Sequence, residues 1–164
     1  MLVKDIVAIS GMSGLFKTET QKVNGLIVTS LTEGWTKFVS SRQHLFSPLE
    51  NISIYTDADT VQLADVLLEV HKQKETNPPV GPNAKNEELR AWFVKIVPNH
   101  DTEKVYISDI KKLIKWYEIL EEKGVIENEM KERENVKKEE NDESKKEEDL
   151  NQVENKKVEK KKDE

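Results

Sequence analysis

The three histidines are the residues of this sequence best suited to acid–base or metal chemistry, and they stand far apart at His44, His71 and His100. His100 precedes Asp101, with Asp109 nearby, so this segment could hold a metal ion or a general base with an orienting carboxylate. A histidine in an Asn-His-Asp turn more often caps a helix or faces solvent, and neither a second histidine nor a cysteine lies within ligand spacing. We therefore expect no metal, no cofactor and no catalytic residue.

A second candidate for chemistry is the glycine pair Gly11 and Gly14, which precedes Lys17 and superficially suggests a phosphate-binding loop. Such a loop needs four residues between its glycines and a glycine directly before the lysine, so that backbone N–H groups surround the anion. Here two residues separate the glycines and Phe16 stands before the lysine. The segment is expected to be a turn between strands, and the chain is predicted not to be an enzyme.

Aromatic and basic residues alternate after the Glu-Gly turn that ends at Gly34. Small β-barrels use such interleaved side chains to stack bases or to grip peptides. The alternative is that the tryptophan at the turn folds back and covers the end of the barrel. The candidate binding surface consists of Trp35, Lys37, Phe38 and Arg42.

A cluster of lysines begins just before the last predicted helix of the ordered region and continues along one side of it. Such a patch could contact phosphates, with each contact adding to a salt-dependent affinity. A solvated helix face explains the same residues equally well. The candidate basic patch consists of Lys104, Lys111, Lys112 and Lys115.

The candidate binding surface must be positioned by short strands. Residues 15–20, 26–31, 37–40 and 52–56 are rich in β-branched and apolar side chains and are separated by tight-turn dipeptides such as Asn24-Gly25. Strands this short bury a face by curling into a small barrel. We therefore predict an SH3-like β-barrel followed by a helix, within residues 1–75.

The candidate basic patch must be positioned by helices. A Pro-rich linker is predicted over residues 76–84, because three of the five prolines lie there. After it, residues 85–126 show helical spacing of apolar side chains in two stretches and predict a short helical domain. The apolar positions are Leu89, Trp92, Phe93 and Ile96 in the first stretch, and Ile110, Leu113, Ile114, Tyr117 and Leu120 in the second.

At this point the sequence resembles a bacterial cytoplasmic family of domains of unknown function. The resemblance implies a small SH3-like N-terminal domain and a helical second domain, and it implies no activity. The family's pattern has Lys-Pro where this chain has Met12-Ser13, and tyrosine where it has Phe16. The segments that carry the resemblance are residues 9–16 (ISGMSGLF), 25–31 (GLIVTSL), 49–56 (LENISIYT), 97–101 (VPNHD) and 105–117 (VYISDIKKLIKWY).

Composition separates the C-terminal part of the 164-residue chain from the rest. Residues 127–164 are dominated by Lys and Glu with few apolar side chains, so we predict a disordered charged tail there. Opposite charges four residues apart, such as Glu129 and Arg133, leave a salt-bridged helix or coiled coil as the alternative. The chain has no cysteine and no apolar run of membrane-spanning length, so a cytoplasmic protein without a membrane partner is expected.

Together, these expectations predict an α+β protein whose function is to bind other molecules. A net charge of −6 gives no global field that would attract nucleic acid. An adaptor-like protein-interaction module with an unidentified protein partner is therefore the first prediction, and no small-molecule substrate is evident. The alternative is binding of RNA or single-stranded nucleic acid through the barrel surface and the basic helix.

Overall fold

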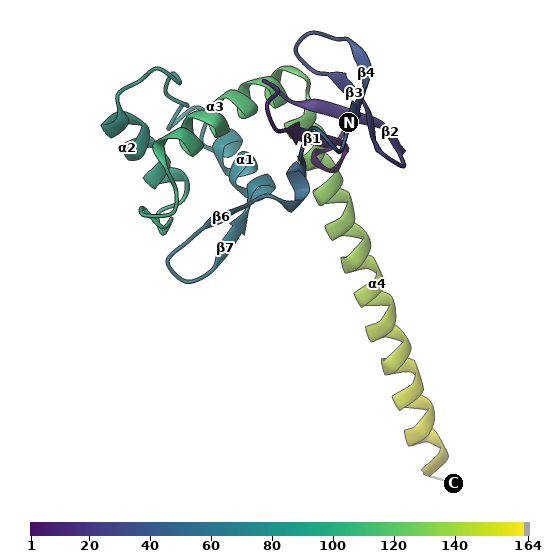
Figure 1. The fold of residues 1–164 in the computed structure, drawn as a ribbon. Coiled ribbons are helices and arrows are strands. Elements are labelled where there is room, and N and C mark those ends of the chain that lie inside the picture. The colour runs from purple at the N-terminus through teal and green to yellow at the C-terminus, as the bar shows by residue number, and fades with distance from the viewer. Residues whose placement is uncertain (163–164) are drawn as a thin grey trace. The chain divides into compact units, whose positions relative to one another are not determined.

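The computed structural model describes the backbone of residues 1–162, and the side chains up to residue 146 together with those of residues 150, 152 and 157. The chain forms a mixed α+β fold in which a five-stranded antiparallel sheet precedes the helices (Figure 1). The sheet has the order β4-β3-β2-β1-β5. Its strands are β1 (Ile6–Ile9), β2 (Phe16–Lys22), β3 (Gly25–Ser30), β4 (Thr36–Ser40) and β5 (Phe46–Pro48).

Tight turns and alternating side chains explain the sheet. The Asn24-Gly25 dipeptide brings β2 against β3, with Lys22 opposite Gly25. Successive side chains of a strand point to opposite faces, so the apolar positions of several strands share one buried surface. The buried cluster of this face consists of Val7, Ile9, Phe16, Val28 and Val39.

The sheet of the described chain is open, because its ladder ends at β4 on one side and at β5 on the other. A closed SH3-like barrel is therefore not confirmed. The segment 52–56, expected as a barrel strand, instead contributes β6 (Ser53–Tyr55) to a separate hairpin with β7 (Thr60–Gln62). The reason is the 3₁₀ turn η2 (Leu49–Asn51), which follows Pro48 and separates β6 from β5.

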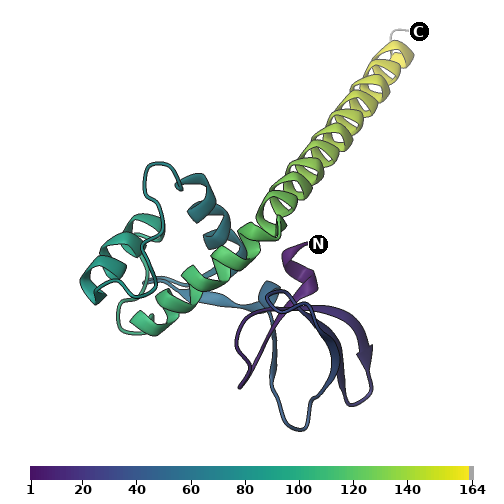
Figure 2. The same ribbon diagram turned by 90° about the horizontal axis from the view of Figure 1, so that it is seen from above.

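Three helices gather to one side of the five-stranded sheet, as two orthogonal views agree (Figures 1 and 2). They are α1 (Leu63–Lys72), α2 (Asn86–Ile96) and α3 (Ile107–Glu122). The apolar positions predicted for α2 and α3 are buried, so helical spacing correctly identified both inner faces. Residues 76–84, the predicted linker, form neither an α-helix nor a strand. Within residues 1–162, no helix combines the length and apolar character needed to cross a membrane.

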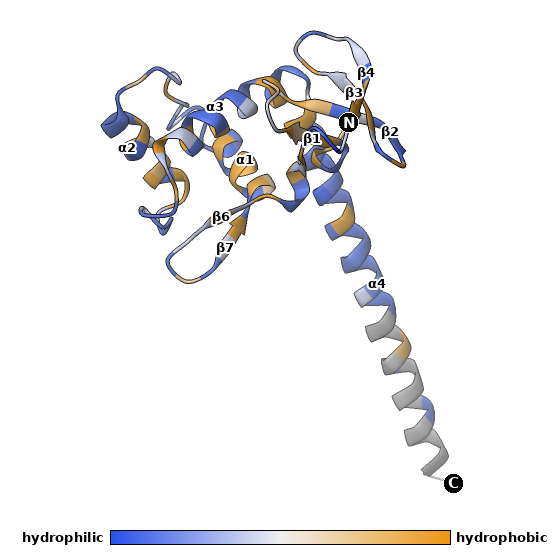
Figure 3. Ribbon diagram, in the orientation of Figure 1, coloured by the Kyte–Doolittle hydropathy of each residue, from blue (hydrophilic) through white to orange (hydrophobic). Residues whose placement is uncertain are grey.

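The chain divides into two compact units, residues 1–128 and 129–164, and the helix α4 (Val125–Lys162) has its first residues in the first unit. Its first residues, Val125 and Ile126, belong to the buried core of the first unit. Beyond them the described side chains are mostly hydrophilic (Figure 3).

The structure differs here from the predicted disorder of residues 127–164, since it describes a helix as far as Lys162; residues 163 and 164 lie outside the described part. Pairs such as Arg133 Nε and Glu129 Oε1, 3.2 Å apart, give this helix local support.

Candidate functional site

A pocket of 1220 Å³ lies within the first unit, between the inner side of the sheet and helix α3. One wall is built by β1, the loop of residues 10–14 and the turn that carries Trp35. The other wall is built by residues 104–119, including much of α3, and β6 contributes as well. We call this space the sheet–helix pocket.

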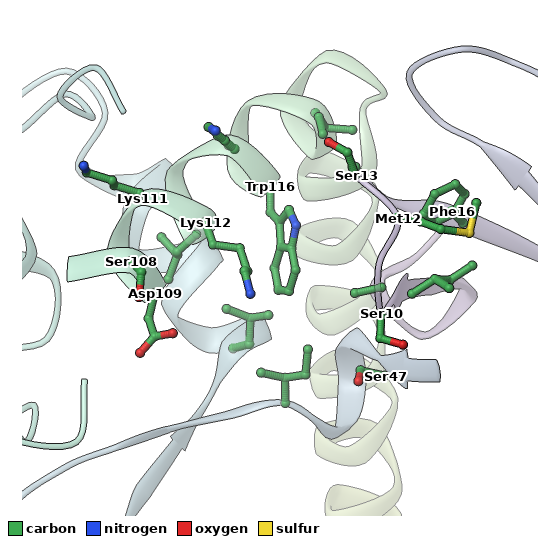
Figure 4. Close-up of a pocket in the computed structure, with 18 of the residues that line it drawn as sticks. Ser10, Met12, Ser13, Phe16, Ser47, Ser108, Asp109, Lys111, Lys112 and Trp116 are labelled. Carbon is green, nitrogen blue, oxygen red and sulfur yellow. The ribbon is translucent and has the colours of Figure 1, made fainter. Parts of the chain in front are cut away.

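On the helix wall, Trp116 is the central side chain. It is half-buried, and Figure 4 shows its indole projecting from α3 into the space opposite Met12 and Ser13 of the loop. The Lys112 Nζ atom lies 5.9 Å from the centroid of the Trp116 ring. In the same view the Lys112 side chain points into the pocket, whereas Lys111 points away. The helix wall thus combines an aromatic surface with an ammonium group.

On the sheet wall, Trp35 is held by three neighbours. Its ring packs against Phe16 with centroids 5.6 Å apart, and its Nε1 donates a hydrogen bond to the Glu33 carboxylate. The Lys37 Nζ atom lies 4.2 Å from the ring centroid on a face of the indole. Trp35 is half-buried and packs on the sheet core, so these contacts agree with the alternative that it covers one end of the sheet.

The structure does not bring the predicted binding surface together on one face. Lys37 and Val39 share a side of β4, and Phe38 points to the opposite side, because side chains alternate along a strand. Phe38 is 50% exposed and covers Gly25, where an added Cβ would lie 3.0 Å from the Phe38 ring and 2.0 Å from the Val39 carbonyl oxygen. Arg42 is exposed in the turn after β4. Of the four predicted residues, Trp35 alone lines the sheet–helix pocket.

The predicted basic patch, in contrast, lies entirely along this pocket. Lys104 Nζ is 5.1 Å from the Tyr55 ring centroid and 3.9 Å from an Asp101 oxygen. The other three members form no ion pair with a side chain that the structure describes. All four lysines, Lys104, Lys111, Lys112 and Lys115, line the pocket.

His100, the histidine considered for catalysis, is buried with both ring nitrogens engaged. Its Nδ1 lies 2.7 Å from the Val97 carbonyl oxygen, and its Nε2 lies 3.1 Å from Nη1 of Arg90. Because a guanidinium group only donates, Nε2 accepts and the proton resides on Nδ1, which donates to the carbonyl. The ring also contacts Phe93 edge-on, with centroids 4.7 Å apart. This histidine has a structural role that ties α2 to the following turn.

The neighbouring carboxylates have backbone partners. Asp101 accepts hydrogen bonds from the amides of Glu103 and Lys104, and Asp109 accepts one from the amide of Tyr106 at 2.9 Å. Among the described residues, no three His, Cys, Asp or Glu side chains are placed to hold a metal ion together.

A buried tyrosine lies behind the helix wall. The Tyr117 hydroxyl is 3.3 Å from Nδ1 of His71, and that nitrogen is 3.6 Å from a Glu121 oxygen. Burial, followed by the charge of Glu121, raises the pKa of Tyr117 above its ordinary value. Tyr117 does not line the sheet–helix pocket, so it supports the wall from behind.

Sequence reasoning missed Trp116 and Met12 as pocket residues. Trp116 borders the apolar stripe of α3, where an aromatic residue is ordinarily assigned to packing. Its position at the edge of that stripe was the available signal, because a side chain there is only partly covered by the neighbouring elements. Met12 gave no signal, because its place opposite Trp116 depends on contacts between segments far apart in the chain.

Two families of domains of unknown function match consecutive parts of the chain: DUF5606 matches residues 3–49 and DUF6852 matches residues 52–120. A protein from Bacteroides vulgatus, solved by solution NMR as a structural genomics target, is similar with 37% sequence identity. The similarity covers 73% of this chain and 85% of that one, with a TM-score of 0.56. No curated protein matches the chain. The sheet–helix pocket is thus lined by residues from both matched segments.

Proposed function

The chain belongs to an uncharacterised bacterial family of domains of unknown function, so we propose a function from its site: a non-enzymatic protein-interaction module. The sheet–helix pocket receives a segment of the partner protein. The observation that carries this proposal is Trp116, a half-exposed aromatic side chain that points into a large pocket opposite Met12. Aromatic anchors in partly enclosed pockets dominate the affinity of many protein interfaces.

The size and lining of the pocket favour a polypeptide over a small molecule. Small-molecule sites usually enclose about 300–1,000 Å³, and this space of 1220 Å³ exceeds that range. Methionine adapts its shape to different partners, which suits a surface that receives side chains of a peptide. Ile52 and Ile54 add aliphatic surface to the same pocket.

The sheet supports a finer proposal for the fold. Four strands in consecutive order with a fifth pairing back against β1 are in keeping with an SH3-like arrangement. We propose that the N-terminal domain is of this type. We also propose that the protein acts in the cytoplasm, because a chain without cysteine forms no disulfide bonds and does not depend on an oxidising compartment.

The test is selection of peptides by the full-length protein from a random peptide display library, followed by titration of the most enriched peptide. We expect Trp116→Ala to weaken binding at least tenfold, or about 1.4 kcal/mol. Phe38→Ala is the matched control, because Phe38 is also an exposed aromatic residue but lies outside the pocket. Equal losses in both variants, or no enriched peptide, would contradict the proposal.

Binding of single-stranded nucleic acid is the second candidate, favoured by the four lysines that share the pocket with two tryptophans. Aromatic side chains stack on bases, and lysines neutralise phosphates. Titration with labelled single-stranded RNA of random sequence at two salt concentrations tests this candidate. Tight binding that falls steeply with salt and requires Trp116 would place it ahead of the protein partner.

A further inference from the structure

Resting on the proposed function, we infer that the sheet–helix pocket selects an acidic segment of the partner, one that places an apolar anchor beside Asp or Glu side chains. The apolar anchor contacts Trp116. The carboxylates meet the lysines of the same wall. Three observations carry this inference: the unpaired lysines, the engaged acids, and the distribution of both over the two walls.

The first observation is that three of the four lysines of the pocket form no ion pair with a described side chain. Lys111, Lys112 and Lys115 form no ion pair with any side chain the structure describes, and Lys112 and Lys115 are exposed. Lys112 is also close to the Trp116 ring, at 5.9 Å from Nζ to the centroid. A ligand that covers the indole therefore brings its neighbouring groups near an ammonium group. A carboxylate there gains a charge-assisted hydrogen bond.

The second observation is that two of the three acidic side chains of the pocket are engaged. The Asp109 carboxylate accepts the amide hydrogen of Tyr106 at the start of α3, at 2.9 Å. The Glu33 carboxylate accepts the indole hydrogen of Trp35 on the sheet wall. Glu118 is the third acid of the lining. The lining holds four lysines and three acids, and all of the lysines belong to the helix wall. Lys104 lies 3.9 Å from an Asp101 oxygen outside the lining, so the unpaired cations of this wall are Lys111, Lys112 and Lys115.

The third observation separates an acidic peptide from a nucleic acid. All four lysines come from residues 104–115, so the positive charge lies along one wall. The loop of the facing wall presents Met12 and Ser13 and no basic side chain. A nucleic-acid strand carries a phosphate at every nucleotide and is usually followed by a basic groove with aromatic platforms. One basic wall facing an uncharged loop suits a chain with carboxylates on one side and an apolar residue beside them.

The experiment compares peptide selection by two full-length proteins. The wild-type protein and the variant Lys111→Glu/Lys112→Glu/Lys115→Glu each select from the same random peptide library. We expect peptides enriched in Asp and Glu around an apolar residue with the wild type, and loss of that enrichment with the variant. The matched control is Lys22→Glu/Lys72→Glu/Lys95→Glu, which makes the same charge change at exposed lysines outside the pocket. The control is expected to select the wild-type peptides.

A titration then measures the effect on one ligand. The most enriched wild-type peptide is synthesised as selected and with each Asp or Glu replaced by its amide. We expect the amide form to bind the wild type at least tenfold more weakly, which corresponds to about 1.4 kcal/mol. We also expect the pocket variant, but not the control variant, to lose the difference between the two forms. Circular dichroism of each variant establishes that it is folded.

The outcomes separate this inference from the proposed function. Selected peptides without acidic enrichment that still require Trp116 would overturn the acidic selectivity and leave the peptide-binding function in place. Failure of Trp116→Ala to weaken any selected peptide would overturn both. Tighter binding of single-stranded RNA than of any selected peptide, with loss in the pocket variant, would assign the lysines to phosphates and overturn the acidic peptide.

Discussion

The two walls of the sheet–helix pocket each present a tryptophan, and the two side chains are held in opposite ways. Trp35 on the sheet wall has a ring neighbour, a hydrogen bond to Glu33 and an ammonium group over its face. Trp116 on the helix wall has Lys112 near its ring, at 5.9 Å. Both side chains are half-buried, but Trp35 has more specific partners. A tryptophan with several such partners is expected to contribute more to stability than one with few. Under the proposed function, the comparison therefore predicts that Trp35 serves stability and that Trp116 serves recognition.

The largest loss of stability is expected from replacing Trp92, a tryptophan outside the pocket that serves as a reference for Trp35 and Trp116. Trp92 is 3% exposed in α2, and its Nε1 donates to the Asn77 carbonyl oxygen at 3.2 Å. Trp92→Ala should lower the free energy of unfolding by about 3–5 kcal/mol, because it leaves a large cavity and an unpaired carbonyl. Urea unfolding followed by circular dichroism measures it. Near-wild-type stability would contradict the packing of α2 described above.

Trp35→Ala should be intermediate and would sharpen the comparison directly. The variant loses the contact with Phe16 and the hydrogen bond to Glu33, so we expect a loss of about 2 kcal/mol in unfolding free energy. Trp35→Phe keeps part of the ring contact and should recover part of the loss. If Trp35→Ala instead left stability unchanged and abolished peptide binding, the roles of the two walls would be reversed.

Tyr117 supports the helix wall from behind, and its ionisation should weaken the fold at alkaline pH. Burial raises the pKa of Tyr117 in the folded state above its value in the unfolded chain, which is about 10. The resulting stability is complete below pH ~10 and is lost as the pH rises toward the folded-state pKa, because the unfolded chain releases the proton first. Thermal melts from pH 8 to 11 should show a steeper decline for the wild type than for Tyr117→Phe. Parallel declines would contradict this account.

Trp116→Ala should have a small effect on stability and a large one on binding. The side chain is half-buried at the edge of the α3 stripe, so we expect a change in unfolding free energy below about 1 kcal/mol. The same variant should lose the selected peptide. A loss of stability as large as that of Trp35→Ala would break the comparison between the two walls.

The smallest effect is expected from removing the second unit. Truncation after Asn128 keeps Val125 and Ile126, which are buried, and keeps the hydrogen bond from Asn128 Nδ2 to the Met1 carbonyl oxygen. The melting temperature of the truncated protein should lie within a few degrees of the full-length value, because the charged segment has few apolar side chains to bury. Truncation after Gly124 is the control, since it also removes both buried residues and should lower the melting temperature clearly. Equal melting temperatures for the two truncated proteins would contradict this account.

Much of the helical region could be predicted from the sequence, because a helical face is a local pattern. The spacing of Leu89, Trp92, Phe93 and Ile96 was sufficient to place all four in the core. The strand period could also have separated Lys37 from Phe38, since neighbours on a strand point to opposite sides. The prediction grouped them by adjacency in sequence and so combined side chains that do not share a surface.

The pocket itself could not be predicted in this way. Met12 and Trp116 stand at distant points of the chain, and their approach depends on how the sheet packs beside α3. The lysines of the basic patch could be grouped from their spacing, yet their role depends on what lies opposite. The charged segment after residue 127 shows the limit of composition, because its low apolar content predicts disorder whereas its i, i+4 pairs favour the helix described here.

The Asn77 side chain and backbone fasten the start of the loop between α1 and α2. Its carbonyl oxygen accepts from Trp92 Nε1, and its Nδ2 lies 3.4 Å from Gln73 Oε1. Further along, an added side chain at Gly81 would meet no atom within 4 Å, and the loop contributes no residue to the pocket. An affinity tag or fluorophore attached at Gly81 would therefore lie on a loop whose first part is held by Asn77. It could report ligand binding there without obstructing the pocket.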